Sequence, residues 1–91
     1  MTTKQEAQSA YSKFICDCME LNIELLTVYK RFEHNPRYAN IIKNFNDELI
    51  PFTGLLMERQ HDMSVENIHK INNQKHKTIA AYNILVAAIT Q

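Results

Sequence analysis

The stretch that decides the fold is residues 4–33, KQEAQSAYSKFICDCMELNIELLTVYKRFE, which contains neither glycine nor proline. Apolar residues recur in it at alternating steps of four and three: Ala7, Tyr11, Phe14, Cys18, Leu21, Leu25, Val28 and Phe32. These steps place all of them on one face of an α-helix, because the helix repeats every 3.6 residues. The stretch therefore predicts a long helix with one continuous apolar face.

A second apolar row runs along the side of this helix that an ordinary amphipathic helix turns to water. The row consists of Cys16, Met19, Ile23 and Leu26, again at steps of three and four. With the first face it widens the apolar arc to roughly 200° of the circumference, so the helix needs neighbours on two sides. Scattered apolar residues are normal on protein surfaces, but a contiguous row is typical of a partner surface. We predict that this row is an interface, and that it forms a two-fold homodimer.

The composition argues against several classes of partner. Ten acidic and ten basic residues give a formal charge of zero, so nothing electrostatic favours nucleic acid or an anionic membrane. No run of eighteen apolar residues occurs and the N-terminus is polar, so we expect neither a membrane span nor a secretory signal. Cys16 and Cys18 diverge by about 200° on a helix and cannot bridge each other. Two reduced thiols indicate a cytoplasmic protein.

Capping signals predict two further helices. The first helix starts near Thr3, with Glu6 completing a capping box, and stops before Asn35. The dipeptide Asn35-Pro36 then starts a second helix at once, and Ser64 caps a third.

The apolar register of the second helix runs unbroken through Pro51 until the helix ends near Gln60. This continuity favours one helix with a kink at Pro51 over two separate helices. Links as short as these make consecutive helices antiparallel neighbours. The predicted fold class is therefore all-α: residues 1–91 form a single helical domain of three long antiparallel helices in an up-down-up bundle.

A polar interruption divides the apolar face of the third helix. Residues 72–77 are all polar, and Lys75 occupies the position that the apolar spacing would fill. Folding the chain at its two predicted turns brings Lys75 level with residue 50, close to Asp47 and Glu48. Because an unpaired buried charge is very costly, we predict a polar core layer in which Lys75 meets an acid at that level or reaches water.

Two Glu-x-x-His pairs raise a different possibility, a metal site. Glu58 with His61 and Glu66 with His69 each share one helical face, a spacing used by di-iron bundles of the ferritin-like class. The run from Asn-Pro through the apolar residues to Asp47-Glu48 also resembles a ferritin-like hairpin. However, Pro51 stands where that motif has its histidine, and the two pairs flank a turn. We therefore expect no metal and no other cofactor, and keep a metal-binding helical protein as an alternative.

The remaining sequence features favour binding over catalysis. With one glycine the chain has no phosphate-binding loop, and Cys18 at a core position is a packing residue more readily than a nucleophile. We predict a protein–protein interaction module, acting as an adaptor, inhibitor or regulator. Leu-Leu-x-Glu from residue 55 and Val-Glu-Asn-Ile from residue 65 are similar to the hairpins of flagellar and type III export chaperones. That resemblance covers a third of the chain and implies an export chaperone. A phage- or plasmid-encoded inhibitor of a host system is a further alternative.

Overall fold

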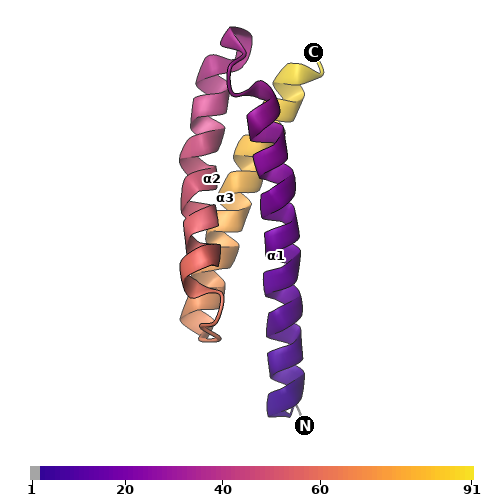
Figure 1. Ribbon diagram of the computed structural model, residues 1–91, viewed down its shortest axis with the longest axis vertical. Coiled ribbons are helices and arrows are strands. Elements are labelled where there is room, and N and C mark those ends of the chain that lie inside the picture. Colours follow the sequence, from indigo (N-terminus) through magenta and orange to yellow (C-terminus); the bar gives the residue numbers. More distant parts are fainter. Residues whose placement is uncertain (1–2) are drawn as a thin grey trace.

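Three long α-helices make up most of the chain in the computed structural model, which describes residues 3–91. They are α1 (Lys4–Phe32), α2 (Ala39–Arg59) and α3 (Val65–Ile89), with a short 3₁₀ helix η1 (Pro36–Tyr38) between the first two. No strand occurs in the described residues. The three helices pack against one another, and the chain turns back at each link (Figure 1). The predicted all-α class is confirmed.

The helix ends follow the capping signals, with one difference. The Thr3 hydroxyl accepts from the Glu6 amide at 3.1 Å while the Glu6 carboxylate accepts from the Thr3 amide at 3.3 Å, so the predicted capping box is confirmed. Ser64 caps α3 as predicted. Asn35, in contrast, caps η1 by accepting from the Arg37 amide at 3.0 Å. Regular α-helix begins only at Ala39, because a tight 3₁₀ turn follows the proline.

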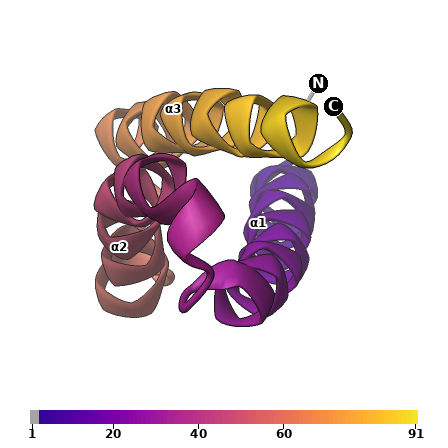
Figure 2. The same cartoon turned by 90° about the horizontal axis from the view of Figure 1, so that it is seen from above.

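The core gathers around α2, which packs most closely on α3 and more loosely on α1. Figure 2 shows α3 lying along one side of the α1–α2 pair. The aromatic rings of Phe45 and Phe52 on α2 are fully buried, and Phe45 lies against Tyr82 of α3 with ring centroids 6.0 Å apart. The molecule is elongated, measuring 52 × 22 × 17 Å.

The buried face of α1 is rotated from the face that the sequence predicts. Its buried residues are Tyr11, Ile15, Cys18, Asn22 and Leu25. Phe14, Leu21 and Val28, which belong to the predicted face, lie at its edge and are half-buried. The rotation brings Asn22, a polar residue, into the core with only 8% of its surface exposed.

Pro51 lies inside α2, which continues through it as one helix. The prediction of one helix in place of two is therefore confirmed, and the bend expected at Pro51 stays a prediction. A proline lacks an amide hydrogen, which loosens the ladder in the preceding turn. Side chains bind carbonyl groups of that turn: Gln74 and Thr78 of α3 donate to the Glu48 carbonyl at 2.9 and 3.1 Å. Thr53 donates to the Leu49 carbonyl at 3.0 Å.

Tyr11 attaches α1 to the link between α2 and α3. Its hydroxyl lies 2.7 Å from the Asp62 carbonyl and 3.1 Å from the Gln60 carbonyl. The buried Asn67 amide donates to the same Asp62 carbonyl at 2.7 Å. These side chains satisfy carbonyl groups just beyond the end of α2, where no helical ladder supplies donors.

Tyr11→Phe should lower the free energy of unfolding by about 1–2 kcal/mol, because it removes the hydroxyl and leaves the ring in place. Tyr29→Phe is the matched control, since Tyr29 is a half-buried tyrosine on the same helix and its hydroxyl makes no hydrogen bond within residues 3–91. Urea denaturation of both variants measures the difference. Equal stabilities for the two variants would show that the Tyr11 hydroxyl contributes nothing.

Alkaline pH should destabilise the fold through Cys18, which is 2% exposed. Burial raises the pKa of the Cys18 thiol, and the nearby Lys75 only partly opposes this. A group whose pKa is raised by folding stabilises the protein fully below its unfolded pKa. That stability is lost as the pH rises through the folded pKa. For Cys18 the loss begins above about pH 8.5, the ordinary pKa of a cysteine in an unfolded chain. Burial also raises the pKa of Tyr11, which acts in the same direction above about pH 10.

The Cys18→Ala variant should therefore lose less stability between about pH 8 and pH 10 than the unchanged protein does. Cys16→Ala is the control, because Cys16 is exposed and the variant should keep the full alkaline loss. Urea denaturation at a series of pH values gives the comparison. If all three proteins lose stability in parallel, ionisation of Cys18 is not the cause.

Candidate protein-interaction surface

The register of α1 against α2 is fixed by a hydrogen bond within the core. The Asn22 amide of α1 donates to the Thr53 hydroxyl of α2 at 2.8 Å. The Thr53 hydroxyl donates in turn to the Leu49 carbonyl, so both groups are satisfied. This contact places residue 22 opposite residue 53. Neighbouring positions on the two helices follow from it, because each residue advances about 1.5 Å along the axis.

The two edges of the α1 buried face point to different sides of the molecule. Phe14 lies on the edge next to α3, since the Lys75 ammonium of α3 is 5.7 Å from the centre of its ring. Met19 and Leu26 lie on the opposite edge, one turn before and one turn after Asn22. That edge therefore borders the side of the α1–α2 pair that faces away from α3.

Apolar residues of both helices meet on this side. Ile50 and Met57 lie one turn before and one turn after Thr53, on the face of α2 next to α1. The exposed fractions are 64% for Ile23, 61% for Ile50 and 71% for Met57. We call this region the seam surface: Cys16, Met19, Ile23 and Leu26 from α1, and Ile50, Gly54 and Met57 from α2.

The structure divides the four predicted interface residues into two kinds. Cys16 and Ile23 are exposed, whereas Met19 and Leu26 are half-buried and pack against the core. The rotation of α1 accounts for the difference, because it turns the Met19–Leu26 edge toward α2. Sequence reasoning missed Ile50 and Met57. Their spacing of seven residues, away from the main apolar face of the second helix, was the signal that could have identified them.

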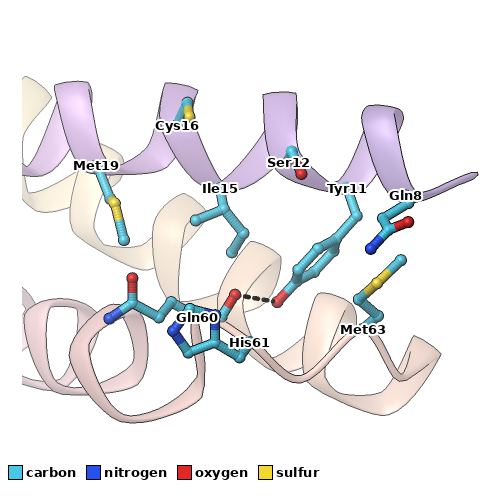
Figure 3. Close-up of a pocket in the computed structure, with 9 residues that line it drawn as sticks. All are labelled: Gln8, Tyr11, Ser12, Ile15, Cys16, Met19, Gln60, His61 and Met63. Carbon is cyan, nitrogen blue, oxygen red and sulfur yellow. Dashed lines mark hydrogen bonds between the residues drawn. The ribbon is translucent and has the colours of Figure 1, made fainter. Parts of the chain in front are cut away.

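An open hollow of about 330 Å³ lies at one end of the seam surface, between α1 and the link that follows α2. Figure 3 shows Met19 and Ile15 above Gln60 and His61, with Tyr11 and Met63 beside them. The residues that line the hollow are Gln8, Tyr11, Ser12, Ile15, Cys16, Met19, Gln60, His61 and Met63. The hollow therefore extends the seam surface with a mixture of amide, thiol and thioether groups.

At the level of the predicted polar core layer, Asp47, Glu48 and Lys75 each make a separate contact. Asp47 pairs with Lys43 at 2.9 Å on the exposed side of α2. Glu48 accepts from Gln74 at 3.2 Å through its carboxylate. Within residues 3–91, Lys75 forms no ion pair with either acid, and the ammonium group of this half-buried residue lies over the ring of Phe14 of α1.

The side chains of the two Glu-x-x-His pairs are exposed. Glu58, His61, Glu66 and His69 all face solvent near the link between α2 and α3. In the part of the chain that the structure describes, no three histidine, cysteine, aspartate or glutamate side chains lie close enough to hold a metal ion. Over the same residues, no helix combines the length and apolar character that a membrane crossing requires.

Comparison of the chain with protein-family models, with curated proteins and with solved structures found no match.

The two thiols should differ sharply in reactivity. Cys16 is exposed at the edge of the hollow, whereas Cys18 is buried and its pKa is raised by burial, so its reactive thiolate is scarce. With Ellman's reagent in dilute solution, one thiol per chain should react fast and the second only as the protein unfolds. Rapid reaction of both thiols in the native protein would contradict the buried position of Cys18.

Proposed function

We propose that the protein is a non-enzymatic interaction module that acts as a small helical homodimer. In this proposal the chain is an up-down-up bundle that pairs through the seam surface. It works by binding another protein, as an adaptor, inhibitor or regulator. The two unpaired thiols fit a reducing compartment such as the cytoplasm.

The observation that carries the proposal is the exposure of Ile23, Ile50 and Met57 on one side of the molecule. Transfer of such a side chain from water to an apolar contact contributes about 1–2 kcal/mol when somewhat more than half of it is exposed. A group of large apolar residues on neighbouring helices marks an association site, whereas isolated ones need no explanation. The charge balance also supports self-association, because a formal net charge of zero causes no long-range repulsion between two copies.

The total solvent-accessible surface area of the chain also supports an interface. The chain exposes 6382 Å², whereas a folded monomer of 10.7 kDa exposes about 5500 Å² on average. The excess of about 900 Å² is close to the roughly 800 Å² that one partner loses in an interface of standard size. Part of this excess lies in the first two turns of α1, which are exposed and extend beyond the other helices (Figure 1).

Sedimentation velocity over a range of concentrations tests the proposal. The unchanged protein should be a dimer, and the double variant Ile23→Glu, Met57→Glu should be a monomer with unchanged helicity. The reason is that two charges per copy would be buried without partners in the interface. Both positions are more than 60% exposed in the single chain, so the fold itself should tolerate the change.

Ile84→Glu is the matched control. Ile84 is exposed by 62%, much like Ile23, but it lies on α3, away from the seam surface. This variant should remain a dimer. A monomeric unchanged protein, or a dimer disrupted by Ile84→Glu and not by the double variant, would refute the proposed function.

A further inference from the structure

Gly54 lies on the seam surface between Ile50 and Met57, one turn after the first and almost one turn before the second. Glycine inside a helix costs stability relative to alanine, so it usually has a local reason. Here the fold of the single chain gives none. Its φ is not positive, and a Cβ atom built on Gly54 would meet no atom within 4 Å. A glycine that leaves open space on an apolar helical face allows another backbone to approach closely.

The apolar residues of the seam surface are arranged symmetrically about one level of the bundle. On α1, Cys16 and Leu26 lie equally far from residue 21, as do Met19 and Ile23. On α2, Ile50 and Met57 are centred between Thr53 and Gly54. The contact between Asn22 and Thr53 sets the two helices in register. The two centres therefore fall at the same height to within about 1 Å.

From this arrangement we propose that a second copy of the chain covers the seam surface, related by a two-fold axis perpendicular to the helices at the level of Gly54. This inference rests on the proposed function and specifies its geometry. Each α2 crosses the α2 of the other copy at Gly54, and the two α1 helices lie antiparallel to each other. The axis pairs Ile50 with Met57, Met19 with Ile23 and Cys16 with Leu26, in each case between copies. Every apolar residue of the surface thus meets another apolar residue.

The absence of charged side chains from the seam surface also favours a second copy of the chain as its partner. The seam surface as defined contains no acidic or basic residue, so it offers no charged group by which an unlike partner would be selected. The acids beside it, Glu20 and Glu58, are exposed, so water screens them at the rim of the interface.

Gly54→Ala separates a role in association from a role in folding. Alanine meets open space in the single chain and favours the helix, so the melting temperature should rise by a few degrees at concentrations where the chain is monomeric. The added methyl group holds the crossing helices apart, so the dimer should dissociate at least tenfold more readily. An unchanged dissociation constant in sedimentation equilibrium would overturn the crossing at Gly54.

Disulfide trapping tests the pairing of α1 with α1. Leu26→Cys places a thiol opposite Cys16 of the second copy, so mild oxidation should give a covalent dimer on non-reducing gels. The matched control is Glu24→Cys, an exposed position on α1 outside the seam surface, which should stay uncrosslinked. The unchanged protein should not crosslink either, because the two Cys16 residues lie about 15 Å apart along the axis.

The results distinguish this geometry from the wider proposal. A dimer that Ile23→Glu, Met57→Glu disrupts, but that neither responds to Gly54→Ala nor crosslinks through Leu26→Cys, refutes the two-fold geometry and leaves the proposed function intact. Ready crosslinking of Cys16 to Cys16 in the unchanged protein also refutes it. A chain that stays monomeric at every concentration refutes both.

Discussion

The hydrogen bond between Asn22 and Thr53 is the contact on which the arrangement of α1 depends. An amide buried in an apolar contact must find a partner, and this one has its partner only when residue 22 stands opposite residue 53. The same bond turns α1 so that Met19 and Leu26 face α2 and Ile23 faces outward. Register and orientation are thus set together by one polar pair, while the apolar contacts around it supply most of the stability.

Polar side chains bind backbone carbonyl groups at two places, one within α2 and one in the link that follows it. Gln74 and Thr78 bind the turn before Pro51, and Tyr11 with Asn67 bind the link that follows α2. These contacts join different helices, so each one also specifies how the helices fit. A core this small has few apolar layers, and directional bonds limit the alternative packings that would bury a similar area.

Much of the fold could be predicted from the sequence, because the apolar spacing and the caps at Thr3 and Ser64 are local signals. The rotation of α1 could not be predicted, because Asn22 is a polar residue beside the apolar face and its partner Thr53 lies 31 residues away in the sequence. Lys75 is a second example. The sequence shows that it interrupts the apolar row, but its contact with the ring of Phe14 depends on how α3 packs on α1. The α1 half of the seam surface was visible as a second row, whereas the contribution of Ile50 and Met57 emerged only when α2 was placed beside α1.

Dimerisation through the seam surface requires that a second copy of the chain covers this surface in solution. Isotope-filtered NMR on an equal mixture of ¹³C-labelled and unlabelled protein observes contacts between copies directly. In the proposed dimer we expect intermolecular nuclear Overhauser effects from the methyl groups of Ile23 to Met19 and from those of Ile50 to Met57. Intermolecular signals confined to Ile84 on α3, or none at concentrations where the chain is fully folded, would contradict it.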